Sequence, residues 1–238
     1  MTSHRASGGL EVRMEPAKSY EGMFWDYSSS DQAGLGDVLY AAAKRAFDVT
    51  LSVLGLLLAL PLMLLIAVAI RLETRGRVIY RQVRVGKDCR PFHILKFRTM
   101  IQSFGVPLTI GEEDPRITRV GRFLRKHKLD ELPQLINVIR GEMSLVGPRP
   151  EATGFINLGD RRQRAVFSVL PGLTAPSSLK FFDLDQELSR VDDPVKHYRS
   201  QVLPRKIEMN LSYIRERSLV KDVGIVVATL GRLAGFLK

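Results

Sequence analysis

Cysteine and histidine are scarce in this chain of 238 residues, which contains one cysteine and four histidines. The single cysteine, Cys89, cannot form a disulfide within the chain and excludes a zinc site made of several thiolates. The histidines are scattered along the sequence and do not have the spacing of metal ligands. Any metal site is therefore expected to use oxygen ligands.

Charged residues are absent from residues 49–70, which read VTLSVLGLLLALPLMLLIAVAI. A straight helix of this length would cover about 33 Å, enough for a hydrocarbon core of about 30 Å. The run starts too far into the chain for a secretory signal peptide and has no cleavage-site pattern. It therefore predicts a membrane segment, with a core helix of a water-soluble protein as the alternative.

Pro61 lies inside the apolar run and predicts a bend, because it has no N–H and its ring collides with the carbonyl of Leu57. The two parts, 49–60 and 62–70, would form helices of about 18 and 13 Å, and neither crosses a bilayer alone. Basic residues lie at both ends of the run: Lys44, Arg45, Arg71, Arg75 and Arg77. Because Lys and Arg favour the cytoplasmic side, a re-entrant hairpin with both ends there is favoured over a spanning helix.

Acidic residues are few in residues 71–128, which follow the apolar run. The chain as a whole has a formal net charge of +11. Residues 71–128 contain 15 Lys or Arg residues against 5 Asp or Glu residues, a net charge of +10. Such a block attracts nucleic acid, anionic lipid head groups or phosphorylated substrates, and a solvated basic face is the alternative. Residues 1–43 instead have a net charge of −3 and mix Gly, Ser and charged residues, which is typical of a mobile tail.

Strand-like composition in residues 78–85 and 91–98, around a turn with Gly86, Lys87 and Asp88, predicts a β-hairpin. Four further segments have helical periodicity: 115–128, 129–140, 202–216 and 219–238. The last helix is apolar and is expected either to pack on the domain or to lie on a membrane surface.

Two adjacent acids, Asp130 and Glu131, follow one residue after the basic run 125–128. Pro133 fits only the first turn of a helix, so the helix is expected to begin near the acids, where its dipole favours negative charge. Neighbouring helical residues do not face each other, so the pair fits a shared site for Mg²⁺ and phosphate better than the opposed carboxyls of a glycosidase. A carboxylate can also attack phosphorus itself. A solvated helix start is the alternative.

The turn VGPRP, residues 146–150, is expected to be stiff, because each proline fixes its own φ and restricts the residue before it. Arg149 would then be held out on a rigid support. An ordinary proline turn is the alternative.

The order of these features resembles the bacterial sugar transferase family, the monotopic phosphoglycosyl transferases. The match is close over residues 44–150 and loose over 151–238. The matching stretches are KRAFD (44–48), the apolar run with its proline, GKDCRPFHILKFRTM (86–100), DPRITRVGRFLRKHKLDELPQLINVIRGEMSLVGPRP (114–150) and PGLT (171–174).

The resemblance implies transfer of a sugar 1-phosphate from a UDP-sugar to undecaprenyl phosphate with release of UMP, the first membrane step of bacterial glycan assembly. Asp130 is the implied nucleophile, which carries a covalent phosphosugar and contacts Mg²⁺. Glu131 would support it through proton handling or as a second metal ligand. Arg125 is the implied phosphate-binding arginine.

Further residues are assigned to substrate binding. The turn Pro148–Pro150 would place Arg149 near the nucleotide, and Lys96 and Arg98 are weaker candidates for the anionic substrates. Gln134, on the polar stripe of the 129–140 helix, completes the set.

The implied fold is α+β and mostly helical. It has an N-terminal tail (1–43), a re-entrant membrane helix (44–77) and a catalytic domain (78–238) with a short β-hairpin and amphipathic interfacial helices. This domain is expected at the cytoplasmic face of the bacterial inner membrane, without a nucleic-acid partner and with an oligomer possible.

Two positions depart from the family pattern. Leu60 stands where family members often have Ser before the membrane proline, and APSSLKF (175–181) replaces the common Gly-Leu-Trp continuation. Two other interpretations remain open. One is a non-catalytic membrane-anchored module that binds anionic lipid or nucleic acid through 71–128, and the other is a metal-dependent phosphodiesterase that transfers the phosphorus to water.

Overall fold

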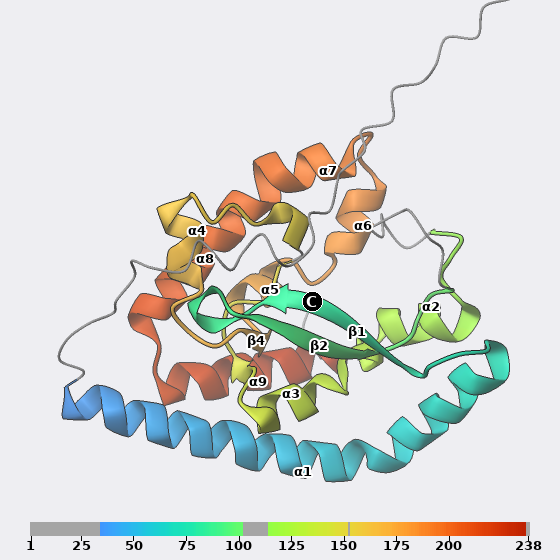
Figure 1. Ribbon diagram of the computed structural model, residues 1–238, viewed down its shortest axis with the longest axis horizontal. Helices are drawn as coiled ribbons and strands as arrows, with labels where there is room; N and C mark the ends of the chain where they lie inside the picture. The colour runs from blue at the N-terminus through green and yellow to red at the C-terminus, as the bar shows by residue number, and fades with distance from the viewer. Residues whose placement is uncertain (1–33, 102–113, 152, 237–238) are drawn as a thin grey trace, which may run out of the picture.

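Helices make up most of the protein. The computed structural model describes residues 34–101, 114–151 and 153–236, so residues 1–33 of the expected tail lie outside the described part. The helices are α1 Leu35–Glu73, α2 Arg119–Lys126, α3 Gln134–Arg140, α4 Arg161–Val166, α5 Pro176–Lys180, α6 Leu184–Ser189, α7 Pro194–His197, α8 Leu203–Glu216 and α9 Leu219–Leu233. The strands are β1 Ile79–Val85, β2 Pro91–Phe97, β3 Ser144–Val146 and β4 Gly172–Thr174 (Figure 1). The prediction of a mostly helical α+β fold is confirmed.

The β1–β2 hairpin forms where strand-like composition predicts it. Its strands are antiparallel, with Ile79 opposite Phe97 and Val85 opposite Pro91. In the connecting turn Asp88 has a φ of 54°, a left-handed conformation that aspartate tolerates better than most residues. A second pair of strands, β3 and β4, is parallel and was not predicted from the sequence.

Helix α1 begins earlier than the predicted membrane segment, so residues 35–43, assigned to the tail from the sequence, are helical. The helix continues through Pro61 instead of dividing into two helices. Figure 1 shows that it bends in its second half without reversing direction. A proline inside a continuous helix causes such a bend, because one backbone hydrogen bond is lost and the ring crowds the preceding turn. A hairpin of two separate helices is therefore not seen.

Both halves of α1 pack against the same domain. In the first half, Lys44 Nζ lies 2.8 Å from Asp222 Oδ2 of α9, and the guanidinium of Arg45 donates to the last carbonyls of α3, at 2.7 and 2.9 Å. In the second half, Ile66 and Ile70 are buried in a cluster with residues of β2 and α2. The two basic residues before the apolar run thus anchor the helix to the domain.

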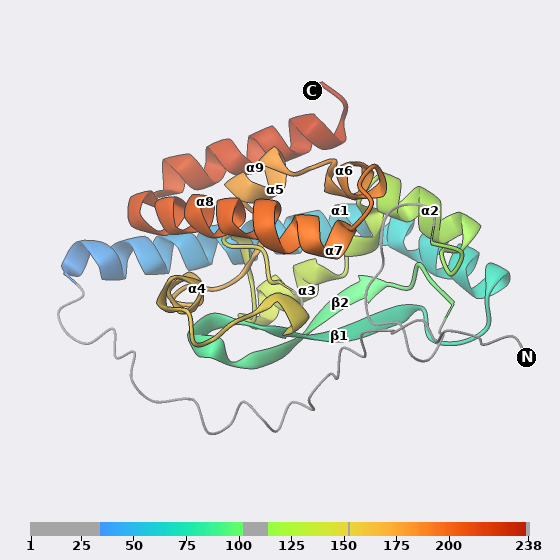
Figure 2. The ribbon, with the colours of Figure 1, turned by 90° about the horizontal axis from the view of Figure 1, so that it is seen from above.

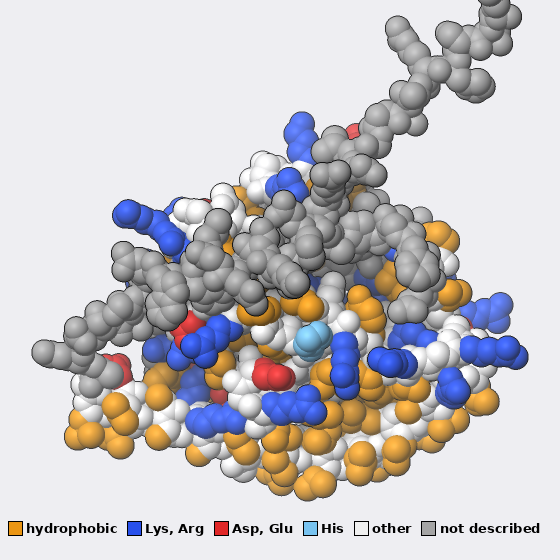
Figure 3. All heavy atoms as spheres, in the orientation of Figure 1, with side chains coloured by type: hydrophobic (Ala, Val, Ile, Leu, Met, Phe, Trp, Pro, Cys, Tyr) orange, Lys and Arg blue, Asp and Glu red, His pale blue; other side chains and the backbone are white. Residues whose placement is uncertain are grey.

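The outer face of α1 remains uncovered. Only 11% of its most apolar window is buried, although the helix is long and apolar enough to cross a membrane. Figure 3 shows hydrophobic side chains gathered along the edge that α1 forms, with basic side chains above them. The core helix of a water-soluble protein would be mostly buried, so that alternative does not fit.

The main core lies between the hairpin and the C-terminal helices. Figure 2 shows α8 and α9 on one side, the β1–β2 hairpin on the other and α3 between them. Asn137 of α3 is fully buried; its amide donates to His93 O at 2.8 Å and accepts from Leu95 N at 3.0 Å. This side chain pairs with the edge of β2 that β1 leaves open, and it fixes α3, together with the turn before it, against the hairpin.

Candidate active site

The two adjacent acids lie in a separate 3₁₀ turn, Leu129–Glu131, and not in the first turn of α3. Lys128, directly before this turn, has a φ of 54°, so the chain changes direction after α2. Pro133 is the N-cap of α3. The helix expected over residues 129–140 is therefore shorter: the left-handed Lys128 separates the turn from α2, and α3 begins only after Pro133, which has no N–H to donate.

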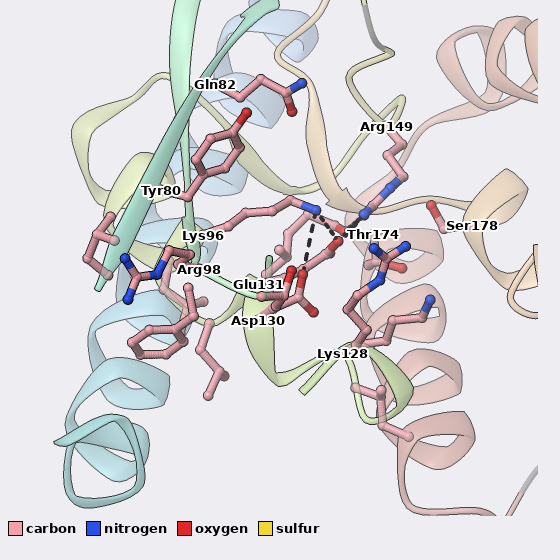
Figure 4. Close-up of a pocket in the computed structure, with 18 of the residues that line it drawn as sticks. Tyr80, Gln82, Lys96, Arg98, Lys128, Asp130, Glu131, Arg149, Thr174 and Ser178 are labelled. Atoms are coloured by element: carbon pink, nitrogen blue, oxygen red, sulfur yellow. Dashed lines mark hydrogen bonds and ion pairs between the residues drawn. The ribbon is translucent and has the colours of Figure 1, made fainter. Parts of the chain in front are cut away.

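A cavity of about 1630 Å³ opens beside this turn. The β1–β2 hairpin, the turn after β3 and helix α8 supply cationic and polar side chains, and α1, α3 and α9 supply leucines and valines. Six of the residues singled out from the sequence line it: Lys96, Arg98, Arg125, Asp130, Glu131 and Arg149. Figure 4 shows Lys96 reaching from β2 and Arg149 from the opposite side toward the two acids.

Glu131 is held by two cations. Lys96 Nζ lies 2.8 Å from its Oε1, while Arg149 binds both carboxylate oxygens. Burial alone would raise the pKa of Glu131, but Arg149 and Lys96 outweigh it and hold the pKa well below its usual range. Glu131 is therefore a fixed negative charge that positions Lys96 and Arg149, and proton handling does not fit it.

Asp130 has a different environment although it is the next residue. Its exposed fraction is 7%, its closest cation is Lys96 at 3.9 Å, and within the described residues its carboxylate accepts no hydrogen bond. Burial raises the pKa of Asp130, and the charges of Lys96, Lys128 and Arg149 offset this in part. Asp130 is thus the carboxylate of the pair with oxygens available to a substrate.

The turn that carries Arg149 follows β3 and is held to β4 by backbone hydrogen bonds. Gly147 N donates to Thr174 O at 3.0 Å, and Gly172 N donates to Pro148 O at 2.9 Å. A Cβ on Gly172 would lie 2.1 Å from Gly147 N, so only glycine allows this approach. Both prolines of the turn are buried, while Arg149 lines the cavity. Pro148 and Pro150 therefore support the arginine from behind.

Two residues assigned to substrate binding have other roles or places here. Arg98 donates to Thr74 O and Arg75 O, both at 2.8 Å, and so caps the end of α1. Gln134 is fully buried and does not line the cavity. Its side-chain amide has no hydrogen-bond partner among the residues that the structure describes. Arg125 lines the cavity, with one guanidinium nitrogen 3.9 Å from Met100 Sδ.

Several polar residues of the cavity were not found from the sequence. Tyr80, Gln82 and Arg84 lie at alternate positions of β1 and all line the cavity; the period of two in a strand could have placed them on one face. Lys206 of α8 also lines it, and its ammonium is 3.0 Å from Glu151. No local signal marks Lys206, because its partner is distant in the sequence.

The donor atoms of the site fit a magnesium ion only in part. Mg²⁺ keeps several waters and commonly binds through one or two carboxylates together with substrate phosphates. Asp130 fits this pattern, whereas both oxygens of Glu131 are engaged by Arg149 and Lys96. Within the described residues no cluster of three or more His, Cys, Asp or Glu could hold a metal. Substrate phosphates would have to complete the coordination.

Comparison with known proteins confirms the resemblance drawn from the motifs. The model of the family described as bacterial sugar transferase matches residues 39–235. The chain is 40% identical over 198 residues to an undecaprenyl-phosphate glucose phosphotransferase of Komagataeibacter xylinus, covering 79% of this chain and 35% of that protein. It is 38% identical over 223 residues to a UDP-N-acetylgalactosamine-undecaprenyl-phosphate N-acetylgalactosaminephosphotransferase of Aeromonas hydrophila, covering 89% and 49%.

A third relative is similar in length to this chain. The exopolysaccharide production protein PSS of Rhizobium leguminosarum bv. phaseoli is 36% identical over 207 residues, covering 81% of this chain and 98% of that protein. The chain therefore spans about a third to a half of the first two relatives and nearly all of the third.

Proposed function

Because the chain belongs to the bacterial sugar transferase family, we propose that it transfers a sugar 1-phosphate from a UDP-sugar to undecaprenyl phosphate and releases UMP. The observation that carries this proposal is the buried Asp130, with available oxygens, in a cavity lined by cations on one side and leucines on the other. The printed names of the relatives support it, since two are transferases that act on undecaprenyl phosphate with different sugars.

In the first half-reaction, a carboxylate oxygen of Asp130 attacks the phosphorus that bears the sugar. A bond forms between this oxygen and phosphorus, the bond to the bridging oxygen breaks, and UMP leaves with the electron pair. In the second half-reaction, an oxygen of the lipid phosphate attacks the same phosphorus, a lipid diphosphosugar forms, and Asp130 is released as a carboxylate.

The cations around the acid pair neutralise the phosphate charge. Lys96 and Arg149 are held in place by Glu131, so they need no rearrangement when a diphosphate enters. Asp130 would hold Mg²⁺ together with the donor phosphates, and the ion would neutralise charge on them. The loss of Asp130 should therefore abolish turnover, whereas the loss of Glu131 should misplace two cations.

The way α1 is held supports a re-entrant placement at the cytoplasmic face. Lys44 binds α9 near one end of the helix, and Ile70 packs into the domain near the other. A straight spanning helix would put its ends on opposite sides of the bilayer. A single domain could not then contact both ends. A bent helix whose apolar outer face enters the cytoplasmic leaflet satisfies both attachments, and the basic side chains above it in Figure 3 would meet the head groups.

The test is to incubate the purified chain with Mg²⁺, undecaprenyl phosphate and a panel of UDP-sugars, and to measure UMP release. Release with at least one donor, dependent on the lipid phosphate for multiple turnovers, is expected. Free sugar phosphate formed without the lipid would instead indicate a phosphodiesterase. Salt-sensitive binding of anionic lipid or nucleic acid without any UMP release would indicate a non-catalytic module.

A further inference from the structure

One side of the cavity is apolar and reaches from the uncovered edge of α1 to the acid pair. Helices α1 and α9 form its walls, and α3 lies between them, where Gly55 of α1 allows an approach to Leu135. Seven aliphatic residues line this side, which we call the apolar channel: Leu51, Leu54, Leu58, Leu135, Val226, Leu230 and Leu233. Several are largely exposed in the protein alone, Leu58 by 84% and Leu230 by 60%. An apolar chain lying along α1 and α9 would cover them.

Two cations lie beside the apolar channel, around the ring of Phe182. The ammonium of Lys128 is 5.6 Å from the ring centroid, and the guanidinium carbon of Arg232 is 5.1 Å from it. Lys128 and Phe182 both line the cavity. Figure 4 shows Lys128 on the side of the cavity next to α9, opposite the hairpin residues Tyr80 and Gln82. A pair of cations thus adjoins the apolar channel on the side away from the hairpin.

Lys128 and Arg232 differ in how far they are already paired with carboxylates of the chain. Within the described residues Lys128 has no carboxylate at ion-pair distance, whereas Arg232 pairs with Asp183 at 2.8 Å. Lys128 is two residues before Asp130, and its left-handed backbone fixes its direction. An anion bound by Lys128 would therefore lie close to the group that Asp130 carries.

We propose that Lys128 and Arg232 bind the phosphate of the lipid acceptor, whose chain lies in the apolar channel between α1 and α9. This inference rests on the proposed function and deepens it, because it assigns separate cations to the two substrates. Lys96 and Arg149, the two cations held by Glu131, hold the donor phosphates, and Lys128 and Arg232 hold the acceptor on the α9 side. Charge complementarity and the continuity of apolar surface with an anion site favour a lipid phosphate as the occupant.

The assignment explains how one aspartate could serve both half-reactions. After UMP leaves, the phosphosugar on Asp130 must be approached by a second phosphate, which the two negative charges would oppose in water. A lipid phosphate held by Lys128 brings its attacking oxygen to this phosphorus with part of its charge neutralised. The new phosphorus–oxygen bond forms as the bond to Asp130 breaks, so atoms and electrons balance.

The test separates the half-reactions for the full chain in lipid nanodiscs with an accepted UDP-sugar. Arg232→Gln and Lys128→Asn remove the charges, and asparagine tolerates the left-handed backbone at position 128. We expect the KM for undecaprenyl phosphate to rise about tenfold in each variant, which corresponds to about 1.4 kcal/mol. Without the acceptor, the UMP burst should fall by a smaller factor than the KM for undecaprenyl phosphate rises. Arg232→Lys should restore part of the affinity for the acceptor. Lys126→Asn, in an exposed residue of α2 outside the cavity, is the matched control and should change neither.

The outcomes distinguish this inference from the function on which it rests. If the unaltered chain gives no UMP burst with any donor, the proposed function fails. If it gives the burst but the variants lose both half-reactions equally, or keep the acceptor KM, the assignment of Lys128 and Arg232 is overturned.

A binding measurement tests the occupant. The unaltered chain should bind a fluorescent polyprenyl phosphate more tightly than the corresponding polyprenol, and Arg232→Gln should reduce that preference. Equal competition by phosphatidylglycerol vesicles would show a general site for anionic lipid and overturn the proposal.

Discussion

The two walls of the cavity are held together by different forces. The wall of the β1–β2 hairpin and the Arg149 turn depends on partly buried ion pairs, in which Glu131 fixes Lys96 and Arg149. The apolar channel between α1 and α9 consists of aliphatic side chains, and Leu58 is 84% exposed there. The first wall is complete within the folded chain, whereas the second needs an apolar partner. This difference suits a site that takes one substrate from water and the other from a bilayer, and the following predictions test it.

The largest effect is expected at Asp130, which lies between the two walls. Asp130→Asn removes the nucleophile, so kcat should fall by at least about 10⁴-fold, as is usual when a covalent nucleophile is lost. Rapid-quench measurement of UMP should show no burst, while the melting temperature in nanodiscs should stay close to that of the unaltered chain. A burst of normal amplitude would remove Asp130 from its proposed role.

Glu131→Gln should damage the ion-paired wall. Two partly buried cations lose their counter-ion, so we expect kcat to fall by about 100-fold and the free energy of unfolding by about 2 kcal/mol. The pKa of Glu131 is held below its usual range, so its stabilising charge is present above the pKa of the unfolded state and is lost as the pH falls through the folded-state pKa. The stability difference between the two proteins should therefore narrow at strongly acidic pH, and a difference that grew there would contradict this account.

Lys96→Met should change the pH dependence of the first half-reaction. Activity requires ionised Asp130, so it is lost as the pH falls through the pKa of this group. Lys96 lowers that pKa against the effect of burial, so its removal should move the acidic limb of UMP release to higher pH. Lys87→Met, in the hairpin turn outside the cavity lining, serves as control. An unchanged acidic limb of the pH profile would show that Lys96 does not lower the pKa of Asp130.

The smallest effect is expected in the apolar channel. Leu54→Ser should raise the KM for undecaprenyl phosphate by about fivefold, because part of a leucine contact is lost, and should leave the KM for the UDP-sugar unchanged. Leu57→Ser, in an exposed residue of α1 that does not line the cavity, is the matched control. Equal effects of both substitutions would show a general weakening of membrane contact.

Local patterns predicted several elements of this fold well. Strand-like composition on either side of a turn predicted the β1–β2 hairpin, and the helical periodicities predicted α8 and α9, because each pattern depends on neighbours in the sequence. The adjacent acids and the proline turn likewise drew attention to Asp130 and Arg149. The parallel pair β3–β4 was missed, because its strands have three residues each and their pairing is entirely non-local.

Two basic residues make contacts within the fold that their charge did not predict. Arg98 and Lys44 were interpreted from their charge, as an anion-binding residue and a membrane-flanking residue. Arg98 lines the cavity and also donates to carbonyls at the end of α1, and Lys44 binds Asp222 across 178 residues of sequence. Charge alone cannot tell these uses apart, because a guanidinium or ammonium can donate to a backbone carbonyl, a carboxylate or a phosphate.

The sequence by itself determined the family, the apolar character of α1 and the presence of two acids behind a basic run. Tertiary structure alone decided which acid is held in ion pairs and which is available, because Lys96 and Arg149 reach Glu131 from separate elements, while the carboxylate of Asp130 accepts no hydrogen bond from any residue that the structure describes. It also decided that cations and leucines meet in one cavity. The physical reason is that burial and ion pairing depend on which distant segments pack together, and a linear pattern of side chains does not specify that.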